Sequence, residues 1–484
     1  MGGKDRYCRS NKLQPYNNML VKFHKTFYSF PSRPSRTRED DRIFEALGGV
    51  QMYDQMKLRK IFGGALLAAA LAHGAAAQDK PDSLDVGVFT FMSGPAAAYG
   101  MPGKQGAEII IEQINADGGV GGVPISASFV DEAQGAEGVL SEYRRLAENG
   151  TTEAMIAALS SGHCLALAPV ADQLKMPTIG WNCDTHQLYQ TGEFDYFYRP
   201  NGNTIAEFVA FALYFLDQHP DLKTVAFINP DYSFGHDAAE IVKAAIKALR
   251  PDVKVVAELY PKLGSPSYQT EVSRLSAARP EVIFSNLWGA DLENFVRQAQ
   301  PRGLFNQSNV VLALGETILE RIDLPEGVTV GVLGDGMWNS PTAKEIGRAE
   351  AFAEAYREKF GENPIFPSVK MANAFLVLKS AYEAAMEENG GTWPTKDQVV
   401  GALEGISVTT LTGEVTFRAD NDGIVDQIVG TTVKPEGAEH VTIGNMVRYD
   451  GKTLLPPEGE DALAWISKLT PEFMDNLPDA GSYK

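Results

Sequence analysis

Cysteine is scarce in this chain, which has only three cysteines in 484 residues. Cys164 and Cys183 lie in the body of the chain, and no Cys-x-x-Cys pair occurs. Together with His163 and His186 they lack the usual spacing of zinc ligands, so we expect no bound metal. In an oxidising compartment the two cysteines could form a disulfide, but the sequence leaves open whether their sulfurs meet.

Motifs of enzymes are also missing. The chain has no Walker sequence, no His-Glu-x-x-His and no Gly-x-Ser-x-Gly. A Ser161–His163–Asp184 triad is a weak candidate, because its first two members are almost adjacent on one turn. We therefore expect a protein that is not an enzyme and has no cofactor.

No long apolar run follows residue 77, so we expect a soluble processed protein. The run Ile61–Leu71 is short, follows basic residues after Met56, and precedes the small residues at 75–77. This pattern is typical of a secretory signal peptide over 56–77, with cleavage near Ala77–Gln78 and export to the periplasm. We interpret residues 1–55 as a gene-start artefact or a disordered extension; a genuine extension before an internal signal anchor is the alternative.

Basic charge is in short supply. Residues 1–77 hold 13 of the 43 basic and 6 of the 62 acidic side chains, which leaves the rest of the chain with a net charge of −26. Such a surface repels nucleic acid and anionic lipid. We therefore expect no nucleic-acid partner.

The stretch from 84 to 131 has the pattern of a strand, a helix and a second strand. The strand Leu84–Thr90 leads into a loop with glycines at 100 and 103, and an amphipathic helix follows. The pattern predicts a βαβ unit whose first loop lies at the carboxyl end of a strand, where open α/β sheets bind ligands. Short apolar strands and helices continue to alternate up to 181, and a similar series starts after 203. The chain is therefore expected to be α/β, with two similar lobes built on buried, largely parallel sheets.

Polar residues follow two of the predicted strands. Ser160 and Ser161 precede a predicted helix, where a serine can cap the helix or help to bind an anion. Asn182 and Asp184 end the next strand and should face the same crevice. Aromatic residues near strand ends suggest an aromatic-walled pocket, although each alone is more often part of a core. They are Tyr99, Trp181, Phe234 and Trp288.

Two segments carry a resemblance to a known family. Ser93-Gly94-Pro95 and then Asn115-Ala116-Asp117-Gly118-Gly119, in that order, resemble the leucine/isoleucine/valine-binding family of type I periplasmic solute-binding proteins. The likeness extends over roughly residues 84–429. It implies a receptor of an ABC importer, with two lobes joined by a three-strand hinge. The corresponding division is 84–203 with 334–413 for lobe 1, and 204–333 with 414–484 for lobe 2 and the tail.

The resemblance also implies roles for individual residues. Ser161 matches the serine that takes the ligand carboxylate, beside the backbone of Asn182, and Glu316 matches an acid that pairs with an ammonium group. Asp184 stands where the family often has threonine, and Trp181 and Trp288 add bulk. Tyr99, Phe234 and Trp288 match aromatic wall positions.

These matches predict a small-molecule ligand, an amino acid or related carboxylate, that is delivered to membrane permease subunits. The departures at Asp184 and the two tryptophans favour a larger, flatter ligand, such as an aromatic acid or an amide. A ligand sensor that feeds a signalling partner is a further alternative.

Overall fold

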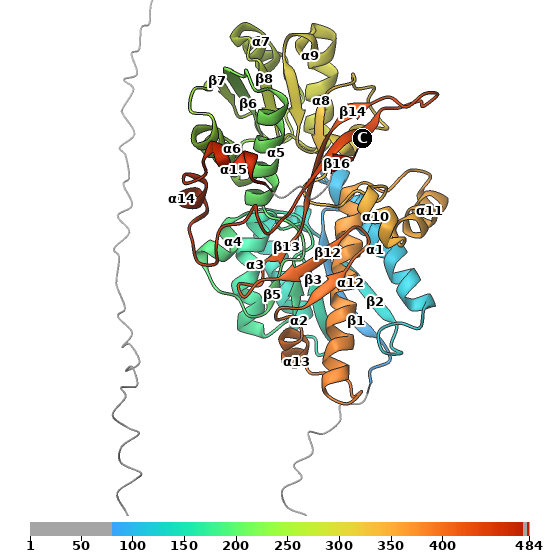
Figure 1. The fold of residues 1–484 in the computed structure, drawn as a ribbon. Helices are drawn as coiled ribbons and strands as arrows, with labels where there is room; N and C mark the ends of the chain where they lie inside the picture. The colour runs from blue at the N-terminus through green and yellow to red at the C-terminus, as the bar shows by residue number, and fades with distance from the viewer. Residues whose placement is uncertain (1–79, 478–481, 484) are drawn as a thin grey trace, which may run out of the picture. The chain divides into compact units, whose positions relative to one another are not determined.

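The computed structural model of the protein describes residues 80–477 and 482–483 (Figure 1). The predicted artefact or extension at 1–55 and the predicted signal peptide at 56–77 lie outside these residues. Within the described part, no helix combines the length and apolar character needed to cross a bilayer.

The first sheet has five strands, and every neighbouring pair is parallel. Their order is β2-β1-β3-β4-β5, so β1 lies inside the sheet. The strands are β1 (Leu84–Thr90), β2 (Ile125–Asp131), β3 (Thr152–Ile156), β4 (Thr178–Ile179) and β5 (Phe197–Tyr198). The helices between them are α1 (Ala97–Ala116), α2 (Gly135–Ala147), α3 (Ser161–Leu174) and α4 (Gln187–Thr191), with a 3-10 turn, η2 (Glu132–Gln134).

The second sheet has eight strands in the order β16-β15-β14-β10-β9-β8-β6-β7. The five strands from β10 to β7 are parallel, whereas β14, β15 and β16 join antiparallel at the other edge. The strands are β6 (Thr224–Ile228), β7 (Lys254–Leu259), β8 (Val282–Ser285), β9 (Asn309–Leu312), β10 (Thr329–Gly331), β14 (Gln427–Val433), β15 (Thr442–Tyr449) and β16 (Ser482–Tyr483).

Helices flank the second sheet as well. They are α5 (Thr204–Gln218), α6 (Ser233–Leu249), α7 (Gln269–Ala278), α8 (Gly289–Ala299), α9 (Leu304–Gln307), α14 (Ala462–Ile466) and α15 (Pro471–Asp475), with 3-10 turns η3 (Gln300–Arg302) and η4 (Gly315–Ile318). Helix α5 is buried from Thr204 to Leu216 on all its faces. A helix that is apolar all round belongs inside a large fold, and α5 packs against both α6 and β14.

The remaining elements follow β10. They are α10 (Pro341–Ile346), α11 (Ala349–Phe360), α12 (Phe366–Glu388), α13 (Lys396–Gly401) and an antiparallel sheet of β11 (Ser407–Thr409), β12 (Glu414–Phe417) and β13 (Gly423–Ile424). Helix α12, drawn in orange, returns to pack along α1 (Figure 1). The β11–β12 pair spans the lobe boundary predicted between 413 and 414, and the division into lobes stays a prediction.

Three segments carry the chain between the two large sheets. The first follows β5, the second follows β10, and the third joins β13 to β14. They are hydrogen bonded to one another: Gly423 N–H donates to the Arg199 carbonyl (2.7 Å), and Ile428 N–H to that of Gly334 (3.0 Å). The α/β class, the two sheets and the three-segment hinge therefore agree with the predicted fold.

The loop predicted around residues 98–103 is instead the start of α1, so that prediction was wrong. The glycines there serve close packing. A Cβ on Gly100 would lie 1.9 Å from the Phe91 carbonyl oxygen, and one on Gly103 would lie 2.9 Å from the Trp181 ring. A side chain at either position would push α1 away from its neighbours.

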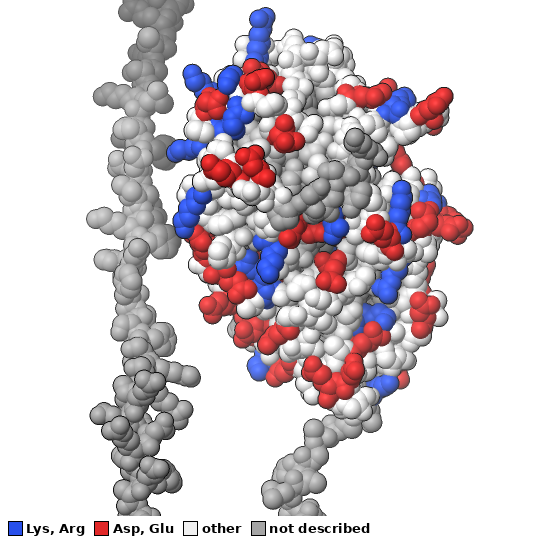
Figure 2. Space-filling view, in the orientation of Figure 1, with Lys and Arg blue, Asp and Glu red and all other residues white. Residues whose placement is uncertain are grey.

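After Pro435 the chain adds one more long strand, β15, to the second sheet. This strand pairs antiparallel with β14, and Gly430 and Gly444 lie close together at a break in its register. Figure 2 shows acidic side chains over much of the visible face, with basic ones among them, in keeping with the negative net charge.

Candidate functional site

A cavity of about 440 Å³ lies where the loops after both large sheets meet. Its lining comes from the segments that follow β1, β2, β3 and β4 of the first sheet and β6, β7, β8 and β9 of the second. Its size suits a small organic ligand. The lining residues are Phe91, Ser93, Gly94, Pro95, Ala96, Tyr99, Ala133, Leu159, Ser160, Ser161, Asn182, Asp184, Tyr232, Phe234, Leu263, Trp288 and Leu314.

The start of α3 forms a polar part of this lining. The buried carboxylate of Glu132 accepts hydrogen bonds from Leu159 N–H (2.7 Å) and Ser160 N–H (3.3 Å), and contacts His163 Nδ1 at 2.7 Å. Ser160 does not cap the helix with its side chain. Glu132 therefore fixes the loop before α3. The backbone amides of the first turn of α3 form the positive end of the helix dipole.

Ser161 is the first residue of α3 and is 95 % buried, with 5 % of its surface exposed. It lines the cavity, and among the described residues its hydroxyl has no hydrogen-bond partner in the protein. A hydroxyl beside free helix amides can bind a carboxylate. The geometry thus suits the anion-binding prediction better than the capping alternative.

Asn182 and Asp184 complete the polar part of the cavity. Asn182 is buried and its Oδ1 has no hydrogen-bond partner in the protein, so it can accept a hydrogen bond from a ligand. The Asp184 carboxylate lies 3.1 Å from Lys370 Nζ, which lies 3.5 Å from Glu207 on its other side. Burial, and then the charge of Asp184, raise the pKa of Glu207 to about 8.

The opposite part of the lining is aromatic. The ring centroids of Tyr99 and Trp288 are 5.1 Å apart, and Trp288 Nε1–H donates to the Tyr232 hydroxyl at 3.0 Å. Tyr232 and Phe234 lie 6.2 Å apart between their centroids. Offset and tilted rings of this kind make a firm wall for a flat ligand.

The structure brings six of the eight predicted ligand-binding residues to the cavity: Ser161, Asn182, Asp184, Tyr99, Phe234 and Trp288. Trp181 is not among them. Its side chain is fully buried behind α1, against Gly103, and its Nε1–H donates to the Phe89 carbonyl at 2.9 Å. Trp181 therefore does not form a wall of the cavity, as was predicted, and its side chain packs in the interior instead.

Glu316 also lies outside this cavity. It belongs to η4 and lines a separate cavity of about 260 Å³ together with Arg321 and Trp338. Its carboxylate accepts a hydrogen bond from Phe366 N–H (3.3 Å), and burial raises its pKa to about 8. Leu314, two residues earlier, reaches the cavity in its place. The structure thus does not pair Ser161 with Glu316 across one site.

Several lining residues escaped the sequence reasoning. Phe91, Tyr232, Leu263 and Leu314 all follow strand ends, which was the signal used for the other aromatic residues. Lys370, which contacts Asp184 but does not line the cavity, was missed because it comes from α12, almost 190 residues after Asp184, and no local pattern marks it.

The two cysteines of the body lie together. Their Cα atoms are 5.9 Å apart, and a disulfide between them would join α3 to the segment that carries Asn182 and Asp184. The residues considered for zinc have other contacts: His163 meets Glu132, and His186 meets Thr204 and Asp237. His163 therefore faces Glu132 rather than a Ser161–Asp184 triad.

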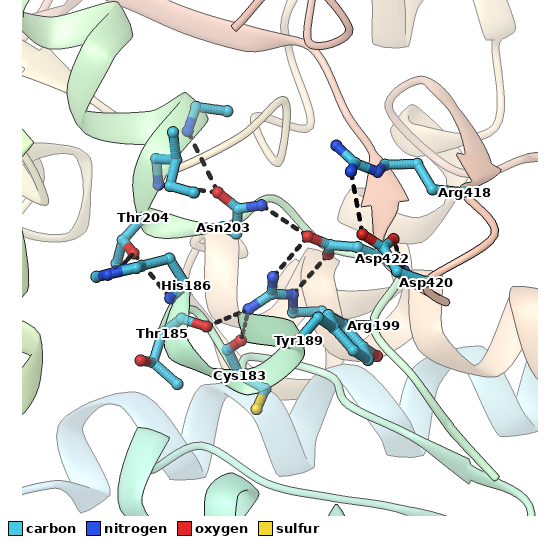
Figure 3. A network of polar contacts seen from close by, with 12 residues as sticks. Cys183, Thr185, His186, Tyr189, Arg199, Asn203, Thr204, Arg418, Asp420 and Asp422 are labelled. Carbon is cyan, nitrogen blue, oxygen red and sulfur yellow. Dashed lines mark hydrogen bonds and ion pairs between the residues drawn. The ribbon is translucent and has the colours of Figure 1, made fainter. Parts of the chain in front are cut away.

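A second buried network lies in the hinge (Figure 3). Arg199 binds Asp422 through two hydrogen bonds of 2.8 and 2.7 Å, and its Nη1 donates to the carbonyls of Cys183 and Thr185. Asn203 donates to the same carboxylate at 2.7 Å and caps α5 through its other side-chain atom. The network joins the first and third crossing segments.

Comparison with known proteins agrees with this architecture. The sequence pattern of the family described as "Periplasmic binding protein" matches residues 83–438, most of the chain. The chain belongs to the periplasmic binding protein family. The resemblance noted from the sequence is thereby confirmed, and this family consists of solute-binding proteins of the periplasm.

Individual relatives are distant. "Leu/Ile/Val-binding protein homolog 7" of Brucella melitensis is 28 % identical over 319 residues, which is 62 % of this chain and 76 % of that protein. "Leu/Ile/Val-binding protein homolog 4" of Brucella abortus is 24 % identical over 76 % of this chain and 88 % of its own.

Solved structures share the fold. A solute-binding protein of an ABC transporter from Rhodopseudomonas palustris BisB5, in complex with 3,4-dihydroxybenzoic acid, has a TM-score of 0.66 at 19 % identity and covers 77 % of this chain and 98 % of its own. The branched-chain amino acid binding protein LivJ of Streptococcus pneumoniae, in complex with isoleucine, has a TM-score of 0.62 at 18 % identity, covering 76 % and 99 %.

Proposed function

We propose that this protein is the substrate-binding component of an ABC importer and that its ligand is a small organic carboxylate with a flat aromatic body. The observation that carries the proposal is the cavity itself, which has helix α3 and Ser161 on one side and aromatic rings on the other. A carboxylate suits the helix end, and an aromatic body suits the rings.

Import would proceed by a shift of population between open and closed forms. The cavity is lined from both large sheets, so a ligand that contacts both favours the form in which they lie closest. The closed form would then be the one that membrane permease subunits recognise. A ligand gains nothing from closure unless it binds that form more tightly.

An amino acid is the second candidate. Asp184 in the lining can approach an ammonium group, and relatives of this chain carry branched-chain amino acid binding names. Two observations favour the aromatic acid: the Asp184 carboxylate is already paired with Lys370, and Glu316 faces a different cavity.

A thermal-shift screen separates these candidates. Benzoate, 4-hydroxybenzoate, benzamide, phenylalanine and leucine are added to the purified protein, because a ligand at 100 times its Kd stabilises the folded state by about 2.7 kcal/mol. We expect the aromatic acids to raise the melting temperature most. A response to amino acids alone would support the second candidate, and no response to either class would overturn the proposal.

Serine 161 supplies the test of the site. Ser161→Ala should weaken binding of the best carboxylate about fivefold, because one hydrogen bond contributes about 1 kcal/mol. Ser233→Ala is the matched control, since Ser233 is likewise the first residue of a helix, α6, but is exposed and does not line the cavity. Equal affinities in wild type and Ser161→Ala would contradict the assigned orientation of the ligand.

We further propose that the protein reaches the periplasm through a signal peptide at 56–77 and that it is not an enzyme. N-terminal sequencing of the exported protein should start near Gln78. The bound ligand should be recovered unchanged after prolonged incubation, and a product detected by mass spectrometry would contradict the binding role. A sensor role would instead predict capture of a signalling protein and no effect of gene deletion on uptake of the ligand.

A further inference from the structure

The cavity contains one acid and no basic residue among the described residues that line it. That acid is Asp184, whose side chain is almost fully buried. An uncompensated carboxylate in such a place would repel a ligand that carries a carboxylate of its own. Binding of an anion therefore requires that the charge of Asp184 be offset from behind the wall.

Lys370 is placed to supply that offset. It lies in the first turns of α12, is 2 % exposed, and holds its ammonium 3.1 Å from Asp184. It does not itself line the cavity. Its other neighbours are Glu207 at 3.5 Å and the Phe366 ring, whose centroid lies 5.4 Å from the ammonium.

The balance of charge depends on Glu207, which faces the same ammonium from α5. Burial and Asp184 raise the pKa of Glu207 to about 8, which favours its neutral form, and the ammonium of Lys370 lies closer to Asp184 (3.1 Å) than to Glu207 (3.5 Å). The positive charge of Lys370 is then left for Asp184. Arg199 interacts electrostatically with both Glu207 and Asp184, but its guanidinium group is paired with Asp422. From the side of the second sheet, the Tyr232 hydroxyl also interacts with Asp184.

We propose that Lys370 is a positioning residue that sets the charge of the accepted ligand: by neutralising Asp184 from behind, it lets the cavity take an anionic guest. The inference rests on the proposed function, since it concerns carboxylate ligands of the same cavity. Lys370 does not touch the ligand, but its charge decides whether the cavity prefers a carboxylate or the corresponding neutral amide.

The test compares benzoate with benzamide by calorimetry at pH 7. In Lys370→Met, the carboxyl group of Asp184 has no cation beside it, so benzoate should bind at least about tenfold more weakly while benzamide changes less than about twofold. Adding Asp184→Asn to Lys370→Met should restore benzoate binding, because the pair is then neutral. Lys379→Met, at a partly exposed position of the same helix, is the control and should change neither ligand.

The outcomes separate a charge effect from damage to the fold. Equal loss of benzoate and benzamide in Lys370→Met, or no rescue by the double variant, would overturn the inference. If Lys370→Met does not fold, two other variants test the inference. The preference for benzoate over benzamide should rise in Asp184→Asn and return to the wild-type value in the double variant. A wild-type protein that binds no carboxylate overturns the proposed function instead.

Discussion

Two buried groups of charges lie near the crossing segments, and they are built in opposite ways. Around Arg199 one cation meets one acid, and every nitrogen of the guanidinium group and both oxygens of the Asp422 carboxylate have a hydrogen-bond partner (Figure 3). Around Lys370 one cation meets two acids at 3.1 and 3.5 Å, and both oxygens of Glu207 have no hydrogen-bond partner. The Arg199 group is saturated and joins crossing segments, whereas the Lys370 group is not and borders the cavity.

The two groups of charges therefore differ in what they can do physically. A saturated bidentate pair fixes geometry, because each of its bonds has a defined direction. An unsaturated group can change its protonation when its surroundings change. The hinge is therefore held by a bidentate pair of fixed geometry, while the cavity is backed by a carboxyl group, Glu207, whose pKa burial raises to about 8.

Breaking the saturated group should have the largest effect. Arg199→Met leaves Asp422 buried without its cation, so the free energy of unfolding should fall by about 3–5 kcal/mol. Urea unfolding followed by circular dichroism measures the change. Arg145→Met, which removes an exposed ion pair with Glu142, is the control and should cost less than about 1 kcal/mol. Similar losses in the two variants would erase the contrast between a saturated buried pair and a surface pair.

The unsaturated group should appear in the pH dependence of stability. The folded-state pKa of Glu207, about 8, lies above the ordinary value of 4.5, so the folded protein holds a proton that the unfolded chain releases. The contribution of Glu207 to the free energy of unfolding is fully present below about pH 4.5. It is lost as the pH rises toward 8, by up to about 1.4 kcal/mol per pH unit.

Glu207→Gln should remove that component, so that unfolding free energies measured from pH 5 to 8 fall less steeply than in the wild type. Glu316 and Asp335, with pKa values raised by burial to about 8 and about 7, keep part of the slope in both proteins. An identical slope in wild type and variant would show that Glu207 does not titrate in this range.

The smallest effect is expected from Glu316→Gln. This acid is buried like Glu207, but it borders the other cavity and accepts its hydrogen bond from the Phe366 amide. Affinity for the best carboxylate should therefore stay within about twofold of wild type. A severe loss of affinity for an ammonium ligand would instead support the pairing of Glu316 with an ammonium group that the family resemblance implied.

Much of this architecture follows from local patterns. Short apolar strands that alternate with helices predict parallel buried sheets, and the residues after strand ends predict the cavity, because those ends meet at one edge. That reasoning found Ser161, Asn182, Asp184, Tyr99, Phe234 and Trp288. It failed for Trp181, since the packing of a strand-end residue against Gly103 of another element is a tertiary feature.

Other failures have the same origin. The glycines at 100 and 103 led to the prediction of a loop, because the sequence does not reveal that neighbouring atoms leave no room for a Cβ at these positions of α1. Strand β15 has no marked local pattern in the sequence, and it is stabilised by pairing with β14. Lys370 needed the fold, since only the packing of α12 on α1 brings it to Asp184.

The position of Trp288 has a practical consequence. All five tryptophans of the chain lie among the described residues, and Trp288 is the one that borders the cavity, with its indole N–H on the Tyr232 hydroxyl. Its emission should respond to a guest that stacks on the ring or displaces solvent from it, while the other four supply a steady background. The protein thus carries a built-in optical reporter, and a fluorescence titration of unlabelled material can report occupancy directly.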